Sequence, residues 1–210
     1  MKVFSLLLCS LALLLPAVAI GQELGPDVLV KNVTNEVLDV VRKDKDIQAG
    51  NSKRTMDLVS AKVLPHFNFA HMTELAVGRD WRAANPGQQK TLADEFRILL
   101  VRTYSKALNE YRDQVIDFKP FKMNPADTEA RIRTQVVKPG ARPIPIDYFL
   151  ERLAGGWKVY DIEVDGISLV VNYRESFAAE VRSGGIDGLI KSLQAKNRAG
   201  GTASLGVDKK

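Results

Sequence analysis

The residues of this chain that could carry out chemistry are few, and the spacing of the two histidines does not favour a metal site. His66 and His71 are five residues apart, so one helix would not present both on the same face. The single cysteine, Cys9, lies in an apolar N-terminal segment and would offer no further ligand once that segment is removed. We expect no bound metal and interpret both histidines as surface residues near the start of a helix.

The sequence also lacks the motifs of nucleophilic catalysis. The nearest approach to the Gly-x-Ser-x-Gly motif is Gly166-Ile167-Ser168, but Val170 occupies the position of the second glycine. The sequence also contains neither a P-loop nor a dinucleotide-binding glycine pattern. We therefore predict that the protein is not an enzyme, has no catalytic residue and carries no cofactor.

Asp161 is the one acidic residue that could act as a base. It alternates in phase with apolar residues, and a carboxylate among apolar side chains is a candidate base. The interpretation we favour is that a bulge turns Asp161 to solvent, or that it caps a backbone N–H. The alternative function is an enzyme acting on a hydrophobic ligand in a cone-shaped pocket, with Asp161 or Asp147 as base and Tyr148 or Tyr160 as its partner.

The N-terminus has the pattern of a secretory signal peptide. Lys2 is followed by an apolar run from Val3 to Leu15, by Pro16, and by the small residues of Ala17-Val18-Ala19. The run is shorter than the roughly 20 residues that span a bilayer. We predict cleavage after Ala19, with cleavage after Gly21 as second choice, and hence export.

Charge argues against nucleic acid as a partner. The 210 residues carry a formal net charge of +5, and Lys2 and several lysines and arginines of the C-terminal tail account for most of it. A basic stripe interleaved with aromatic residues is missing from the sequence. We expect a monomer that does not bind nucleic acid.

The apolar pattern of the first half has the period of helices. It predicts helices that begin at Pro26 and near Ser52, the second of which ends before Pro65. A short helix is expected from Phe69 to Gly78, and a long one from Asn85-Pro86 to Tyr111.

After Tyr111 the period changes to two, which predicts four antiparallel strands. They cover 115–118, 130–136, 144–151 and 157–164, with a hairpin turn at Gly155-Gly156. The apolar phase slips between Val159 and Tyr160, which indicates a bulge. From Leu169 the helical period returns, with a break at Gly184-Gly185.

These elements predict an α+β fold. A helical N-terminal half precedes a four-stranded curved antiparallel sheet and C-terminal helices, and helices packed on the one apolar face of the sheet can close it completely or leave a cleft. The expected organisation is a signal peptide (1–19), one α+β domain (20–197) and a disordered tail (198–210).

Two stretches resemble a known family. They are 75–82 (LAVGRDWR), followed by the helical stripe of Phe96, Leu100, Tyr104 and Leu108, and 157–177 (WKVYDIEVDGISLVVNYRESF). Together with the signal peptide, they are similar to the MlaC, or toluene-tolerance auxiliary, family of periplasmic phospholipid-binding proteins, over roughly Asp27 to Ala195.

The resemblance implies a soluble periplasmic carrier of the Mla pathway, which maintains the lipid asymmetry of the outer membrane. Such a carrier holds a phospholipid by its acyl chains, in an apolar lipid cavity that the curved sheet and the helices enclose. It is expected to move the lipid between an outer-membrane lipoprotein–porin complex and an inner-membrane ABC lipid transporter complex. A purely structural adaptor with an ordinary closed core is a weaker alternative.

We expect the lipid site to be lined from three directions. The long helix would contribute Phe96, Leu99, Leu100, Thr103, Tyr104 and Leu108, the strands Val136, Ile144, Ile146, Tyr148, Leu150, Trp157 and Val159, and the segment after the sheet Leu169, Tyr173 and Phe177. Docking to partners is expected at the exposed basic residues Arg79, Arg82, Lys138 and Arg142.

Overall fold

The structure, a computed structural model, describes residues 24–199. The predicted signal peptide and residues 200–210 of the predicted tail lie outside the described residues. In chain order the elements are α1 (Pro26–Lys43), α2 (Lys45–Gln48), α3 (Ser52–Lys62), η1 (Leu64–His66), α4 (Phe69–Val77), η2 (Gly78–Ala83), α5 (Pro86–Tyr104), α6 (Lys106–Asn109), β1 (Val115–Phe118), β2 (Glu129–Val137), β3 (Ile144–Leu153), β4 (Gly156–Val164), β5 (Ile167–Ser168), η3 (Val171–Tyr173) and α7 (Arg174–Arg198).

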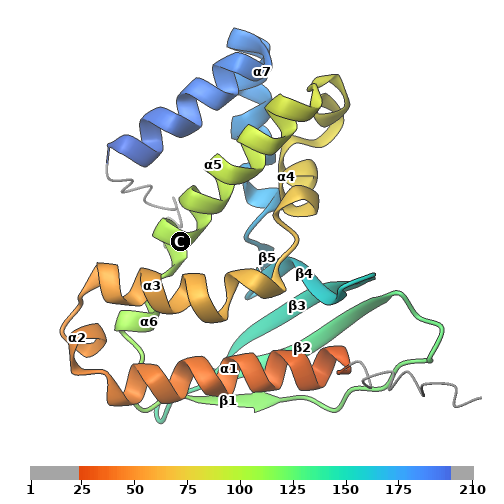
Figure 1. Cartoon of the computed structure of the whole chain (residues 1–210). Coiled ribbons are helices and arrows are strands. Elements are labelled where there is room, and N and C mark those ends of the chain that lie inside the picture. The colour runs from red at the N-terminus through yellow and green to blue at the C-terminus, as the bar shows by residue number, and fades with distance from the viewer. Residues whose placement is uncertain (1–23, 200–210) are drawn as a thin grey trace, which may run out of the picture.

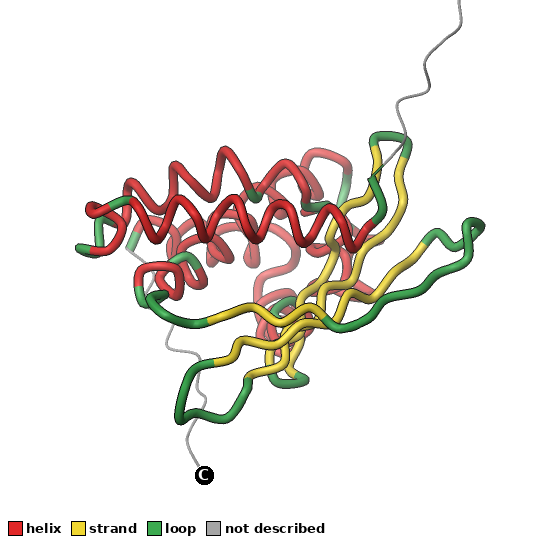
Figure 2. Tube along the Cα trace, turned by 90° about the horizontal axis from the view of Figure 1, so that it is seen from below, coloured by secondary structure: helices red, strands yellow, loops and turns green. Residues whose placement is uncertain are grey.

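The helices form two groups. In Figure 1, α1 lies along the sheet with α3 next to it, while α4, α5 and α7 pack together above them. Viewed from below, the strands run along one side of the molecule and the helices gather on the other (Figure 2). The α+β class predicted from the sequence is confirmed.

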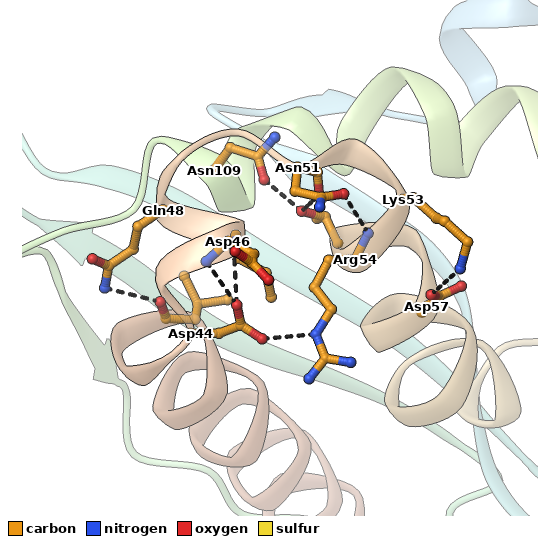
Figure 3. Close-up of polar contacts among 11 residues, drawn as sticks. Asp44, Asp46, Gln48, Asn51, Lys53, Arg54, Asp57 and Asn109 are labelled. Atoms are coloured by element: carbon orange, nitrogen blue, oxygen red, sulfur yellow. Dashed lines mark hydrogen bonds and ion pairs between the residues drawn. The ribbon is translucent and has the colours of Figure 1, made fainter.

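Polar side chains fix the corner between α1, α2 and α3 (Figure 3). The Asp44 carboxylate accepts hydrogen bonds from the backbone N–H groups of Asp46 and Ile47, and from Arg54 Nε at 2.8 Å. Asn51 accepts one from the Arg54 N–H and so caps α3. Such caps satisfy donors that a helix start leaves without partners. Together they join these helices into one unit.

The long helix ends earlier than predicted. The sequence predicts it to Tyr111, but α5 ends at Tyr104 and the chain turns at Ser105 into α6. The turn allows Asn109 to accept a 2.6 Å hydrogen bond from the Thr55 hydroxyl on α3. It also buries Tyr111 against α1. The single helix predicted to Tyr111 is therefore wrong, because this burial is tertiary and leaves no mark on the helical period.

The sheet is an antiparallel meander in the order β1-β2-β3-β4-β5. On β2, buried Ile132 and Thr134 alternate with exposed Glu129, Arg131 and Arg133, which gives the sheet one apolar and one wet face. The apolar face packs against α1 through Val30. The charged face carries an ion pair of Arg131 with Asp147, at 2.6 Å.

β4 contains a bulge and pairs with an additional strand, β5. Phe149 lies opposite Asp161 and Leu150 lies opposite Val159, so Tyr160 is the extra residue of a bulge. The bulge predicted at this point is confirmed. The predicted count of four strands is wrong, since β5 adds a fifth strand whose two residues are too few to show alternation in the sequence.

The C-terminal helix α7 contains a break at the predicted position. Gly185 has φ +67° and ψ −170°, a conformation open in practice only to glycine, whereas Gly184 has no positive φ. The break divides α7 into two segments, and buried residues of both pack on α5.

Alanine substitutions at these two glycines should have opposite effects. We expect Gly185→Ala to lower the free energy of unfolding by about 1–3 kcal/mol, because alanine is strained at positive φ. Gly184→Ala should be neutral or stabilising by up to about 1 kcal/mol. Urea titration followed by circular dichroism measures both, and equal losses in the two variants would contradict the assigned break.

Candidate functional site

The buried apolar residues among 24–199 fall into three clusters rather than one. Small domains usually contain one contiguous core. The helical cluster joins α4, α5 and α7 and includes Phe96, Leu99 and Phe177. The sheet cluster joins α1 to the sheet through Val30, Ile132, Leu150, Trp157 and Val159. The corner cluster joins α1, α2 and the segment after α6 through Val37, Leu38, Val41, Ile47 and Tyr111.

The helical and sheet clusters meet along a boundary that we call the seam. Phe67, between η1 and α4, packs against both clusters. Its neighbour Asn68 donates its backbone N–H to the Val159 carbonyl at 2.8 Å. The chain is therefore pinned at this point, while the two clusters remain separate on either side of it.

Two tyrosine hydroxyls beside the helical cluster are buried without a hydrogen-bond partner among the described residues: those of Tyr104, at the end of α5, and Tyr173, at the end of η3. The Tyr173 ring packs edge-on against Phe96, with centroids 5.1 Å apart. Burial, followed by the neighbouring Tyr173 hydroxyl and Asp161, raises the pKa of Tyr104 well above its usual range. The hydroxyl therefore stays protonated and able to donate.

Asp161 lies close to this pair and is itself satisfied. Its carboxylate accepts hydrogen bonds from the Ser168 hydroxyl at 2.6 Å and from the Ile162 N–H at 2.8 Å. Burial raises the pKa of Asp161, and the bond from Ser168 acts in the opposite direction. The Ser168 oxygen in turn accepts the N–H groups of Val170 and Val171. Asp161 thus connects β4 to the turn before α7, as the backbone-capping interpretation predicts.

The alternative catalytic residues do not converge. Asp161 lies opposite Phe149 and Tyr148 lies opposite Ile162, so the carboxylate and the Tyr148 hydroxyl project from opposite faces of the sheet. Asp147 forms an ion pair with Arg131. The Tyr160 ring stacks on His71 with centroids 4.5 Å apart. The geometry of these residues gives no support to acid–base catalysis.

His71 has a partner that accounts for its position. Its Nδ1 lies 2.9 Å from a Glu151 carboxylate oxygen, which also accepts a hydrogen bond from the Asn68 side chain at 2.8 Å. This contact holds the start of α4 against β3. His66 lies on η1. Within residues 24–199 no group of three or more potential ligands could hold a metal ion.

The structure divides the predicted lipid-lining residues between the clusters. The helical cluster contains or contacts Phe96, Leu99, Leu100, Tyr104, Tyr173 and Phe177; the sheet cluster contains or contacts Tyr148, Leu150, Trp157 and Val159; Leu108 contacts the corner cluster. The remaining five, Thr103, Val136, Ile144, Ile146 and Leu169, lie outside the three clusters of the described residues. The predicted lining is therefore divided mainly between the helical and sheet clusters and does not form one pocket among the described residues.

An open groove of about 490 Å³ separates the two helix groups. It is bounded by α3 and η1 on one side and by α5 on the other, and it is lined by Met56, Ser60, Leu64, Pro65, Arg97, Ile98 and Val101. The sequence analysis did not identify these residues. Ile98 and Val101 are apolar residues outside the main apolar stripe of α5. Their position is the one feature of the sequence that could have indicated an apolar groove on this side of the helix.

The predicted docking residues are exposed but form two separate groups. Arg79 and Arg82 lie on η2, and Lys138 and Arg142 lie on the loop between β2 and β3. Figure 1 places the connection from α4 to α5 at the top of the molecule and the β2–β3 loop at the bottom. Arg142 donates two hydrogen bonds to the Asp165 carboxylate, at 2.6 and 3.1 Å. Across residues 24–199, none of the helices is both long enough and apolar enough to cross a membrane.

Burial of the Asp161 carboxyl predicts how the stability of the fold changes with pH. Because its folded pKa is raised, the ionised form is disfavoured by folding, and stability is gained as pH falls through that raised pKa towards the ordinary value of 3.8. Asp161→Asn keeps the shape without the charge. We expect wild type to gain stability relative to this variant between about pH 7 and about pH 4 in urea titrations.

The matched control is Asp165, for which the expected change of stability with pH has the opposite sign. Arg142 lowers the pKa of Asp165, so the stability that this carboxylate contributes is lost as pH falls through its lowered pKa. Wild type should therefore lose stability relative to Asp165→Asn on acidification. A constant difference between wild type and Asp161→Asn over this range would contradict the buried position of Asp161.

Comparison with known proteins places the chain in a family. Residues 31–195 match the family described as MlaC protein. Toluene tolerance protein ttg2D of Pseudomonas putida is 26% identical over 163 residues, which cover 77% of this chain and 75% of that protein. The intermembrane phospholipid transport system binding protein MlaC of Haemophilus influenzae is 26% identical over 182 residues, 82% of each chain.

A solved structure agrees with these relatives. It is the phospholipid-binding protein from Ralstonia solanacearum in complex with a phospholipid, which is 36% identical to this chain. The two superpose with a TM-score of 0.76 over 83% of this chain and 97% of the other. The resemblance expected from 75–82 and 157–177 is confirmed, and the chain belongs to the MlaC family.

Proposed function

We propose that this protein is a periplasmic carrier that binds a phospholipid by its acyl chains and shuttles it between complexes of the outer and the inner membrane. The observation that supports this most is the relation to the Ralstonia solanacearum protein. That protein was solved with a phospholipid bound, and the two chains are 36% identical over nearly its whole length. Membership of the MlaC family points the same way.

The physical chemistry of the cargo explains what such a carrier must provide. A diacyl phospholipid has on the order of 28 methylene groups, and exposing each to water costs about 0.8 kcal/mol, more than 20 kcal/mol in all. A soluble carrier must therefore take up nearly the whole of both chains. The phosphate is hydrated and can stay outside.

The seam is the place where this chain could provide that space. The helical cluster and the sheet cluster are separate bodies of apolar side chains joined at Phe67. Moving them apart about this point would expose apolar side chains on both sides, and acyl chains between the clusters would cover them again. We propose the open groove between α3 and α5, which carries Leu64, Ile98 and Val101 beside polar residues, as the place where the chains enter.

The proposed partners follow from the proposed transfer of lipid between two membranes. A carrier needs a donor and an acceptor, which we propose are the outer-membrane lipoprotein–porin complex and the inner-membrane ABC lipid transporter complex. The predicted signal peptide would deliver the chain to the periplasm between them. The sequence contains no nucleotide-binding motif, so the energy for directional transfer would come from the transporter.

Native mass spectrometry tests lipid binding. Protein purified from cells should carry the mass of a phospholipid, and delipidated protein should take up lipid from vesicles. Ile146 lies beside Tyr148 and Leu150 on the apolar face but outside the clusters. Ile146→Trp should fill space there and weaken lipid binding about tenfold, as overpacking by roughly 1.4 kcal/mol would.

The control for this substitution lies on the same strand. Leu153, at the end of β3, is 42% exposed and outside the predicted lining. Leu153→Trp adds the same surface and should leave lipid occupancy unchanged. Wild-type protein that is always empty and takes up no lipid would rule out the carrier function, and normal loading of Ile146→Trp would place the chains elsewhere.

Partner docking makes a separate prediction. Reversing the charge of Lys138 and Arg142 together to Glu should slow lipid transfer to partner-bearing membranes by about tenfold at low ionic strength, because charged patches steer association. The amount of bound lipid should not change. A fluorescent-lipid transfer assay measures the rate at two salt concentrations.

Two variants control for other effects of this change. Asp165→Asn removes the ion pair of Arg142 without removing a basic residue, so it should transfer lipid normally. Charge reversal at Arg79 and Arg82 tests the other group of predicted docking residues. If reversal at Lys138 and Arg142 leaves the rate unaltered at low ionic strength, where such contacts are least screened, this loop is not the docking surface.

A further inference from the structure

The two unpartnered tyrosine hydroxyls beside the helical cluster have a cost that no contact among the described residues offsets. A buried hydroxyl without a partner destabilises the fold by about 1–3 kcal/mol, and such groups are rare enough to need an explanation. Tyr104 and Tyr173 place two of them next to each other, on α5 and η3. The Tyr173 hydroxyl lies near enough to form a weak hydrogen bond that raises the pKa of Tyr104, yet neither hydroxyl has a partner at normal hydrogen-bond geometry.

A mutual bond would not resolve the problem in any case. Two hydroxyls carry two donors, and a bond between them uses one. Asp161 is close by, but its carboxylate is already held by Ser168 and by the Ile162 N–H. At least one O–H therefore lacks an acceptor among the described residues, and a ligand oxygen could supply it.

The surroundings favour a neutral acceptor over an anionic one. The Tyr173 ring lies among Phe96 and Phe177, with centroids 5.1 and 5.4 Å away, so the hydroxyls border an apolar cluster. The nearby Asp161 carboxylate would repel a phosphate. In a phospholipid held with its chains inside, the ester carbonyls are the neutral acceptors and lie directly at the head of the chains.

We infer that the Tyr104 and Tyr173 hydroxyls donate hydrogen bonds to an ester carbonyl of the bound lipid, which makes them the residues that distinguish ester-linked from ether-linked lipids. One carbonyl oxygen has two lone pairs and can accept both donors. The inference rests on the proposed lipid-binding function. It assigns these two tyrosines to the glycerol-ester region, while the headgroup plays no part in the contact.

A pair of lipids that differ at the linkage alone tests this. Delipidated mature protein is mixed with vesicles containing equal amounts of a diester phospholipid and its diether analogue, which keeps the chains and the phosphate but lacks the carbonyls. Native mass spectrometry gives the ratio of the two complexes. Wild type should prefer the ester by about tenfold, as expected for one or two neutral hydrogen bonds.

Removing the hydroxyls should remove the preference. In the double variant Tyr104→Phe/Tyr173→Phe the ratio should approach one. Without lipid, this variant should be at least as stable as wild type in urea, since it has lost two unpartnered groups. Tyr160→Phe is the matched control: the Tyr160 ring stacks on His71 and is no part of the pair, so loss of its hydroxyl should leave the ratio as in wild type.

The possible outcomes distinguish the inferred carbonyl contact from the proposed lipid-binding function. Equal uptake of both lipids by wild type, or a preference that survives in the double variant, would overturn the carbonyl contact and leave the carrier function standing. A preference for the ester that disappears in the double variant alone would support it. Wild type that takes up neither lipid would overturn both proposals.

Discussion

The division of the apolar side chains among separate clusters is the constraint on which the rest of this structure depends. α1 covers the apolar face of the sheet, and α5 buries its own stripe against α4 and α7. Phe67 is the residue that packs on both clusters, and the Asn68 N–H bond to Val159 fixes its position. We propose that the fold parts along this boundary while each cluster stays intact, as a carrier of long apolar chains requires.

The polar groups are arranged consistently with that division. Asp44, Arg54 and Asn51 tie α1, α2 and α3 together at one corner (Figure 3). Beside the helical cluster the pairing of polar groups is less complete. Asp161 is satisfied by Ser168, whereas the Tyr104 and Tyr173 hydroxyls are not satisfied within the described residues. These two hydroxyls lie where we propose that a ligand oxygen binds.

Local signals in the sequence predicted most of the fold. Pro26 and Pro86 start helices, Gly185 breaks one, and the change of phase after Val159 marks the bulge at Tyr160. The end of α5 at Tyr104 could not be predicted, because Leu108 and Tyr111 keep the helical period while packing on another cluster. The site was harder to predict than the fold because it also depends on tertiary packing. Periodicity identified Tyr104 and Tyr173 as apolar positions, but their meeting with Asp161 depends on how α5, β4 and η3 come together.

A crystal structure of the protein purified with its lipid tests the central claim most directly, because it locates the acyl chains. Chains between the helical cluster and the sheet cluster, beside Phe67 and Tyr173, with the phosphate at the surface, are the predicted result. Chains that lie on the outer surface, with the helical cluster and the sheet cluster arranged as in this structure, would contradict it.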